Sequence, residues 1–250
     1  MSGLAAARRR RADRARQVAD LLRGEIVRGR FRNGRLPREA VLAREFGASR
    51  NTVRAALGLL RDEGLVDRCP GIGTTIAAEK YPHGLHRLLG LAETLHEHGV
   101  VTNQVRTMTL MEPPAAVRQR LGLAEGEQVV YLERLRRLNG LPLSLDLTYL
   151  VRDVGEPLFD ADLEHNDIFV LLEHIAGRPL GMAELTLEAV NADPHTASVL
   201  EVPRGAALLM VERLTHLSDG RPVDLEFVRF RGDRLTMRGH LRRSGDEHPA

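Results

Sequence analysis

The spacing of apolar residues near the start of the chain predicts three helices followed by a β-hairpin. Apolar side chains recur at helical spacing from about Arg14 to Arg28 and again, over a shorter stretch, from about Arg38 to Phe46. A third helix is expected after Ser49, whose hydroxyl can accept a hydrogen bond from a first-turn N–H, and Gly64 is its expected end. Two β-prone runs then flank the turn 70–73. Helices and a hairpin in this order are typical of a winged helix-turn-helix.

The pattern in the rest of the chain alternates strand and helix signals. Two pairs of strands are joined by Asn139-Gly140 and Asp219-Gly220, dipeptides that favour tight hairpins. We find no internal repeat, although the second hairpin resembles the first in layout. Antiparallel hairpins mixed with helices predict an α+β fold. The expected strands are 105–111, 129–138, 143–151, 183–190, 208–218 and 223–231, and the expected helices are 114–121, 168–176 and 194–200.

Composition changes this picture little but excludes several classes of protein. Hydrophobic residues make up 43% of the chain and charged residues 28%, as in soluble globular proteins. Cys69 is the only cysteine, which excludes an internal disulfide framework and a cysteine-rich metal site. No apolar run approaches the roughly 18 residues of a membrane span. We expect a cytoplasmic protein with no membrane segment, no metal site and no cofactor.

The charge is unevenly distributed, although the formal net charge is only +2. Residues 1–80 contain 17 Arg and one Lys against nine acids, which gives +9. Residues 81–250 contain 18 Arg against 25 acids, which gives −7. A basic front module is a candidate for binding nucleic acid, and the alternative is a solvated basic tail. The expected parts are a disordered basic arm (1–13), the winged helix-turn-helix (14–77), a linker (78–86), a second domain (87–240) and a tail (241–250).

The exposed face of the third helix carries the DNA-binding interpretation. If its apolar side chains face the core, Arg50, Asn51 and Arg54 face outward near its N-terminus, the part of a recognition helix that enters the major groove. Arginine can make two hydrogen bonds to guanine, and asparagine can do the same with adenine. Phosphate contacts are expected from the helix start and from the turn of the hairpin, at Ser49, Thr52, Gly71 and Gly73. The alternative is a small helical domain whose surface is merely charged.

These runs resemble the DNA-binding domain of the GntR family of transcriptional regulators. The matching runs are Leu36-Pro37-Arg38-Glu39, Ser49-Arg50-Asn51-Thr52-Val53-Arg54, Glu63-Gly64-Leu65-Val66 and Gly71-Ile72-Gly73-Thr74. The resemblance implies operator contacts at Ser49, Arg50, Thr52 and Arg54, and at the wing tip from Gly71 to Thr74. Ala40 departs from the family pattern, which often has a polar or basic DNA-contacting residue there. Arg38 can take over that contact.

The rear domain resembles the UTRA effector-binding domain of the HutC subfamily. The matching runs include 121–127, 133–136, 140–143, 188–192, 202–206 and 219–223. The resemblance implies an antiparallel-sheet fold similar to that of chorismate lyase. It also implies that this domain dimerises and binds a small effector that alters DNA affinity.

Two arginines indicate the chemistry of that effector. Arg134 and Arg136 are two residues apart on one expected strand, so both point to the same face, where they suit an anionic ligand. The alternative is a salt-bridge ladder with Asp146 or Glu226, and Glu226, on the last expected hairpin strand, is also a candidate for binding the effector. Asp146 can balance the arginines or bind a ligand hydroxyl or amine. The helix start at Asp167 and Phe169 is where relatives present N–H groups to an anion. The Asp167 carboxylate would itself cap that helix. It therefore favours a ligand with one carboxylate, or one with an amine or hydroxyl facing Asp167, over a sugar phosphate.

Together these observations predict a homodimeric repressor. It would bind double-stranded DNA at an inverted repeat, because the symmetry of a dimer must match its site. A small anionic effector in the rear domain would release it. Two alternatives stay open: an effector-independent regulator or activator with a non-functional pocket, and a lyase of the chorismate-lyase type. The second of these leaves the basic front module unexplained.

Overall fold

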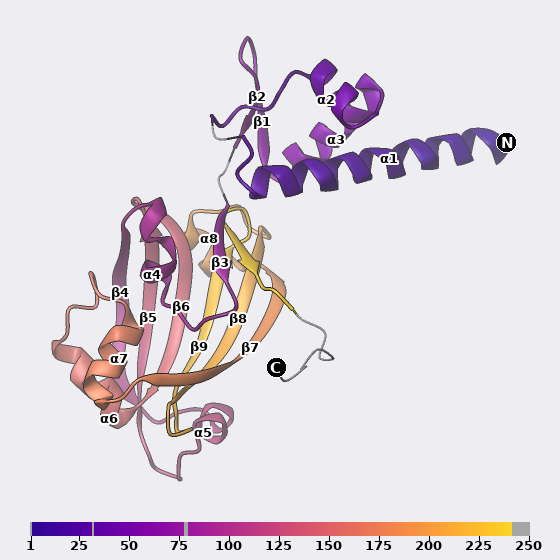
Figure 1. The fold of residues 1–250 in the computed structure, drawn as a ribbon. Coiled ribbons are helices and arrows are strands. Elements are labelled where there is room, and N and C mark those ends of the chain that lie inside the picture. The colour runs from indigo at the N-terminus through magenta and orange to yellow at the C-terminus, as the bar shows by residue number, and fades with distance from the viewer. Residues whose placement is uncertain (1, 32, 78–79, 242–250) are drawn as a thin grey trace, which may run out of the picture. The chain divides into compact units, whose positions relative to one another are not determined.

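The computed structural model of the chain describes residues 2–31, 33–77 and 80–241 (Figure 1). The chain forms two compact units, Met1–Tyr81 and Pro82–Ala250. No helix within these described ranges is long and apolar enough to cross a membrane. The tail predicted over residues 241–250 lies outside the described residues, apart from Leu241.

The front unit has the predicted order of helices and strands. Its elements are α1 (Ser2–Val27), α2 (Glu39–Glu45), α3 (Arg50–Asp62), β1 (Val66–Cys69) and β2 (Gly73–Ile76). The two strands pair antiparallel and form a hairpin that projects beyond the helices (Figure 1). The apolar faces of the three helices meet in one core that includes Val18, Leu22, Leu42, Val53 and Leu60. The winged helix-turn-helix is therefore confirmed.

Helix α1 corrects two expectations. It begins at Ser2, so the prediction of a disordered arm over residues 1–13 is wrong within the described residues. Alanine, leucine and arginine, which dominate 4–11, have high intrinsic helix propensity. That stretch has no apolar periodicity, and periodicity detects only helices with a buried face. The apolar spacing of this helix also predicts Leu21 on the buried face with Val18 and Leu22, but Leu21 is 57% exposed and the small side chains of Ala15 and Ala19 are buried.

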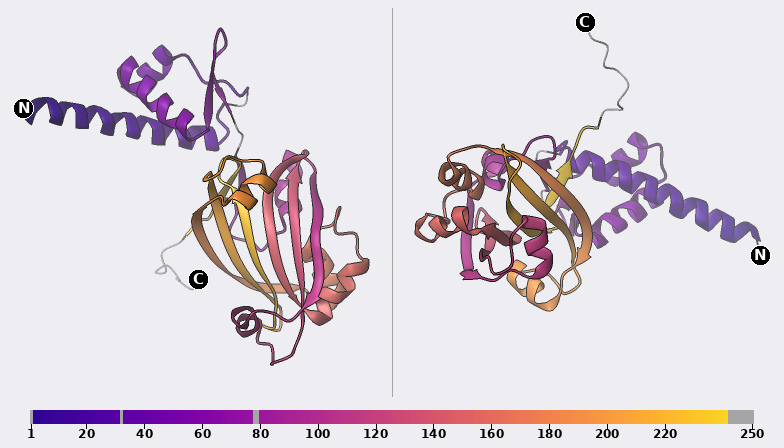
Figure 2. Two further views of the ribbon diagram at one scale, coloured as in Figure 1. Left: turned by 180° about the vertical axis from the view of Figure 1, so that it is seen from behind. Right: turned by 90° about the horizontal axis from the view of Figure 1, so that it is seen from below.

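The rear unit is built on a six-stranded antiparallel sheet, which confirms the α+β class. The strands are β4 (Val101–Met111), β5 (Val129–Leu138), β6 (Leu141–Val151), β7 (Leu180–Asn191), β8 (Ala207–Leu217) and β9 (Pro222–Arg231). Their order across the sheet is β4-β5-β6-β9-β8-β7. The sheet is strongly curved, as the two views in Figure 2 show. Asn139 and Gly140 both have positive φ, as the tight turn between β5 and β6 requires.

The strand order reveals a repeat that the sequence analysis missed. Each half of the sheet consists of a strand, a helix and a hairpin: β4, α5 (Ala115–Leu121), β5 and β6, then β7, α8 (Pro194–Leu200), β8 and β9. Ala115 and Pro194, which open the two helices, are 79 residues apart. The same offset relates Leu132-Glu133-Arg134-Leu135 to Val211-Glu212-Arg213-Leu214. Few identical residues survive between the halves, so the hairpin layout was the only visible trace.

Short helices flank the sheet. They are α4 (Leu91–Leu95), η1 (His96–His98), α6 (Arg152–Gly155), η2 (Glu156–Asp160) and α7 (Ile168–Ala176). The apolar side chains of α5, α6 and α7 form the main core with β5, β6, β8 and β9. A smaller core lies under α8 and includes Leu135, Leu145, Leu200 and Leu208.

The predicted linker over residues 78–86 is corrected in its second half. Residues 81–84 form strand β3 (Tyr81–Gly84), which pairs with β10 (Leu235–Arg238) in a separate two-stranded sheet. The Leu85 N–H continues this pairing by donating to the Arg238 carbonyl at 2.7 Å. A strand of four residues whose partner lies at the far end of the domain leaves no local signal in the sequence. Residues 78 and 79 lie outside the described residues.

Candidate DNA-binding surface and effector cavity

Ser49 fixes the N-terminus of α3, as the sequence predicts. Its Oγ accepts a hydrogen bond from the Thr52 N–H at 3.1 Å, and the two hydroxyl oxygens lie 2.8 Å apart. Thr52 is 6% exposed because it lies on the same helical face as Val53 and Ala56. The expectation that Thr52 presents its hydroxyl to a phosphate is therefore wrong for this arrangement. The exposed side chains at this end of α3 are Arg50, Asn51 and Arg54.

A groove of about 390 Å³ lies between α2, α3 and the wing. It brings together five of the predicted DNA-binding residues, Arg38, Arg50, Arg54, Gly73 and Thr74. Ser49, Asn51 and Gly71 are exposed but do not line this groove. Arg68 also lines it, and the sequence analysis did not single that residue out. Its position becomes evident from the hairpin register, which pairs Arg68 with Thr74.

Arg54 is held by an acidic neighbour. Its Nη2 atom lies 3.0 Å from Oε2 of Glu39, the first residue of α2. The hydrogen bond from Arg54, helped by the positive charges of Arg68 and Arg50, lowers the pKa of Glu39. Side-chain exposure of Arg54 remains 58%, so its guanidinium can exchange this carboxylate for another acceptor.

A cavity of about 210 Å³ opens in the rear unit, between the sheet and the segment 83–91. Strand β3 and helix α4 lie over this face of the sheet (Figure 1). Most of the wall is apolar and includes Leu85, Leu88, Leu185, Val211 and Phe230. The polar lining residues are fewer and are His83, His86, Arg87, Arg136, Asp146 and Arg213. The cavity therefore suits a small molecule with an apolar body and a polar end.

The two predicted arginines lie at different depths. Arg136 lines the cavity, and its Nε lies 2.6 Å from Asp146 Oδ2. Asp146 also accepts a 2.7 Å hydrogen bond from the Ser144 hydroxyl. Arg134 has no exposed surface, does not line the cavity and is 3.7 Å from Asp146. Burial, and then the positive charge of Arg136, lower the pKa of Arg134 to about 10. Of the two guanidiniums predicted to face a ligand, only that of Arg136 lines the cavity.

The second half of the repeat supplies a matching ion pair. Arg213 on β8 forms an ion pair with Glu226 on β9, which is fully buried. The guanidinium of Arg213 also lies 4.4 Å from the centre of the Phe169 ring. Glu226 and Phe169, both predicted to bind the effector, therefore contact Arg213 and do not line the cavity. Burial and the neighbouring Glu226 raise the pKa of Asp224, two residues away, well above its usual value.

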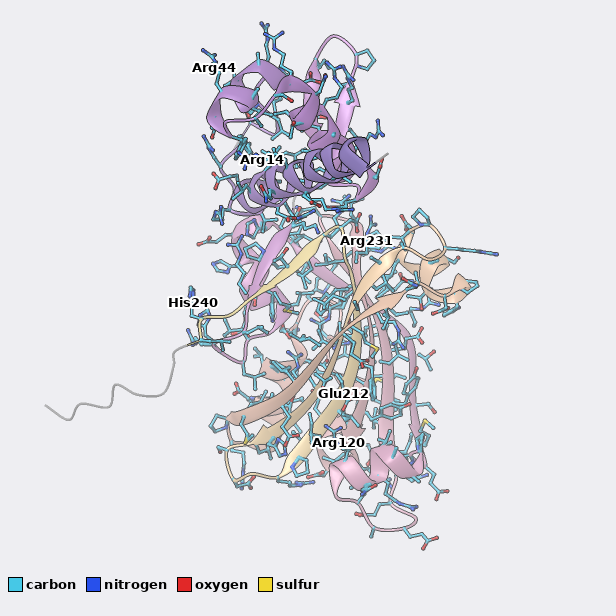
Figure 3. All side chains as sticks on the ribbon, turned by 90° about the vertical axis from the view of Figure 1, so that its right-hand side faces the viewer. Arg14, Arg44, Arg120, Glu212, Arg231 and His240 are labelled. Carbon is cyan, nitrogen blue, oxygen red and sulfur yellow. The ribbon has the colours of Figure 1, made fainter. Side chains whose placement is uncertain are left out.

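Outer ion pairs of the same unit differ from these buried pairs. Arg120 of α5 and Glu212 of β8, labelled in Figure 3, form an ion pair on the surface, with 42% and 24% of their side chains exposed. Glu212 precedes Arg213 on β8, and successive side chains of a strand point to opposite faces. The cavity face thus carries the buried charges. Among the described residues, no group of three or more His, Cys, Asp or Glu is placed to hold a metal ion.

Comparison with known proteins assigns both units. The profile of the bacterial regulatory proteins of the gntR family matches residues 14–76, and that of the UTRA domain matches residues 96–236. The chain belongs to the GntR family, in its HutC subfamily. This GntR regulator is therefore a DNA-binding transcriptional regulator and not an enzyme of the chorismate-lyase type. Its rear unit belongs to a class of domain that binds small effectors.

Individual relatives agree with this assignment. The HTH-type transcriptional regulator Rv0792c of Mycobacterium tuberculosis is 32% identical over 224 residues, covering 87% of this chain and 82% of the relative. The histidine utilization repressor of Pseudomonas putida is 28% identical over 209 residues, covering 83% of each chain. The crystal structure of PhnF from Mycobacterium smegmatis covers 83% of this chain and 91% of its own, with a TM-score of 0.65 at 22% identity. The last likeness shows the fold alone.

Asp167 of the GntR regulator does not act as expected. It occupies the N-cap position of α7, but its side chain makes no capping hydrogen bond there. Its Oδ2 instead accepts a 3.0 Å hydrogen bond from the Ala92 N–H in the first turn of α4. Gly90, at the start of that helix, has no side chain to cap it, so Asp167 supplies the acceptor from a distant part of the chain. The first-turn N–H groups of α7 therefore receive no cap from Asp167.

Two cavity residues of the GntR regulator escaped the sequence analysis. Arg213 could have been found by aligning the two hairpins, since it occupies the position of Arg134 in the repeat. His83 lies on β3, is 7% exposed and lines the cavity. Burial, followed by the positive charges of Arg213 and Arg136, lowers its pKa to about 4. Nothing in the local sequence distinguishes His83 from the other histidines.

Proposed function

We propose that the GntR regulator is a homodimeric repressor, released from an inverted-repeat operator when a small monocarboxylate occupies the cavity. The relative named a histidine utilization repressor supports the sign of regulation. Double-stranded DNA lies against the groove between α2, α3 and the wing. Because that DNA is the bacterial chromosome, the protein acts in the cytoplasm.

The observation that carries the effector half is the polar end of the cavity. Arg136 faces it with a guanidinium, which can bind a carboxylate through two parallel hydrogen bonds. Charge balance disfavours a ligand with more than one negative charge. Three buried or half-buried arginines there are matched by four acids, and the pKa of one of these acids, Asp224, is raised. The arginines are Arg134, Arg136 and Arg213, and the acids are Asp146, Asp167, Asp224 and Glu226. A doubly charged phosphate would add a further uncompensated charge in a region of low dielectric.

On the DNA side, each residue of the groove has a chemical role. Arg50, Asn51 and Arg54 read base edges, since they are the exposed side chains at the start of α3. The DNA backbone is contacted by Ser49, and by Arg38 and Arg68 on the two sides of the groove. The wing tip contributes Gly71, Gly73 and Thr74. Glu39 holds Arg54 until DNA replaces it.

The test is the release of fluorescent operator DNA by a panel of small acids and sugar phosphates. Wild type releases DNA with a monocarboxylate, and Arg136→Gln binds the operator as wild type does but is no longer released. Arg137→Gln is the matched control, because Arg137 is the next residue along β5 and pairs with Glu201 outside the cavity. Release by sugar phosphates alone refutes the carboxylate, and DNA binding unaffected by every compound supports an effector-independent regulator. Equal affinity for a half-site and the full inverted repeat refutes the dimer.

A further inference from the structure

His83, which lines the effector cavity, has a buried ring nitrogen without a hydrogen-bond partner. Its side chain is 93% buried (7% exposed), and its Nδ1 has no hydrogen-bond partner among the described residues. A buried polar atom without a partner costs about 1–3 kcal/mol. Because His83 lines the cavity, a bound molecule can supply that partner once the ring turns towards it.

The surroundings of His83 define what that partner can be. Arg136 and Arg213 are donors only, and Asp146 and Asp167 are acceptors only when ionised. The low pKa of His83 keeps its ring neutral at physiological pH, so it offers one donor and one acceptor. A hydroxyl group complements either nitrogen, because it can both donate and accept. An amino group can also donate to the unprotonated nitrogen.

We propose that His83 selects effectors by hydrogen bonding to a hydroxyl or amino group on an acid whose carboxylate is bound by Arg136. This inference rests on the proposed function, which takes the occupant to be a small monocarboxylate. It narrows that class to hydroxy acids and amino acids. Simple alkyl or aryl acids lack the second polar group and leave the His83 nitrogen unpaired.

The place of His83 in the fold gives this bond a second effect. His83 lies on β3, which pairs with β10 outside the six-stranded sheet, whereas Arg136 lies on β5 within it. An occupant that bonds both residues links the β3–β10 ribbon to the sheet. Amide hydrogen exchange in residues 81–85 should therefore slow when a hydroxy acid binds, and slow less with the matched acid.

The experiment compares acids that differ only in one hydroxyl group. Calorimetric titration of the full chain uses 3-hydroxybutyrate against butyrate, 2-hydroxy-4-methylpentanoate against 4-methylpentanoate, and 4-hydroxyphenylacetate against phenylacetate. Wild type binds at least one hydroxy acid about tenfold more tightly than its partner, the size of one good hydrogen bond. His83→Ala loses that preference. His86→Ala keeps it, because His86 lines the same cavity with an exposed ring.

The remaining outcomes contradict either the role of His83 or the proposed effector chemistry. A hydroxyl preference that is equal in wild type and His83→Ala refutes the role of His83 and leaves the proposed function intact. If His83→Ala does not fold, His83→Phe keeps the ring volume without hydrogen bonding, and a retained preference in that variant refutes the inference. If no acid binds wild type while glucose 6-phosphate or inorganic phosphate releases operator DNA, the proposed effector chemistry is wrong and the inference fails with it.

Discussion

Arginine residues provide positive charge at both sites of the molecule, but the groove exposes them, whereas the six-stranded sheet buries Arg134 and Arg136 on its cavity face. The side chain of Arg54 in the groove is 58% exposed and that of Arg136 in the cavity is 5% exposed. An exposed ion pair contributes about 1 kcal/mol or less. A buried charge carries a desolvation penalty of several kcal/mol that only its partners offset.

This difference separates what the two sites can do. Arg54 can leave Glu39 for DNA at little cost, so the groove can engage any duplex and add specificity at its base-reading residues. Arg136 can accept a ligand only if the charges around Asp146 stay balanced, so the cavity rejects most anions. Arginine therefore gives adaptable binding where it is solvated and selective binding where it is buried.

The largest expected effect is on stability, at the fully buried charge of Arg134. Arg134→Leu removes a guanidinium that balances Asp146 and neighbouring acids, and should lower the free energy of unfolding by about 3–5 kcal/mol. Urea unfolding of the full chain measures it. Arg106→Leu is the control, since Arg106 pairs with Glu133 at a more exposed position on β4, and should cost about 1 kcal/mol or less. Equal losses in the two variants would contradict the distinction between buried and exposed charges.

Acid should weaken the cavity unit through His83. The pKa of His83 is about 4 in the folded protein against 6.5 for an ordinary histidine, so only the unfolded chain gains this proton between those values. Stability is therefore complete above about pH 6.5 and falls as pH drops towards 4, by on the order of 3 kcal/mol. The measurement is the difference in unfolding free energy between wild type and His83→Gln at pH 7 and pH 4.5. A difference that does not change with pH would show that His83 titrates normally.

On the groove side, Arg54→Ala should weaken binding to the specific operator by about 1–3 kcal/mol while leaving stability unchanged. Competition titrations against random duplex measure the loss, and discrimination between operator and random DNA should fall as well. Arg61→Ala is the control, because Arg61 lies on the same helix in its last turn. A loss of equal size on random duplex would reassign Arg54 to a phosphate.

The smallest expected effect separates the cap of α3 from its contact with DNA. Ser49→Ala should cost about 1 kcal/mol of stability, since it removes the acceptor of the Thr52 N–H. Ser49→Asp keeps that acceptor and should restore stability, but its negative charge should lower operator affinity. Thermal unfolding and anisotropy titration on the same samples check both parts. Unchanged DNA affinity in Ser49→Asp would remove Ser49 from the interface.

The front unit could be predicted from sequence because its signals are local. Ser49, Gly64 and the apolar spacing of α3 specify where that helix begins, ends and packs. Thr52 was predicted to be exposed because Ser49 and Thr52 are both small polar residues of one helical turn. The sequence does not show that one of them caps the helix while the other is buried. The helical conformation of the predicted arm was not foreseen, because high intrinsic helix propensity leaves no periodic pattern of apolar residues.

The cavity could be predicted only in part. Strand alternation correctly placed Arg134 and Arg136 on one face of β5, and that face does carry the cavity. How deeply each arginine is buried could not be predicted, because burial depends on the segment 83–91, which covers the sheet and lies far from β5 in sequence. Asp167 shows the same limit: its partner, Ala92, lies 75 residues earlier.

The pairing of β3 with β10 has a consequence for biosynthesis. Gly84 and Leu235 are 151 residues apart, so at about 5–20 residues per second β3 waits on the order of 10–30 s for its partner to be translated. All helices and strands of the front unit have by then left the ribosome. A nascent chain can thus complete its DNA-binding unit well before its effector cavity, and a message truncated before codon 235 would yield a protein whose His83 strand never acquires its partner.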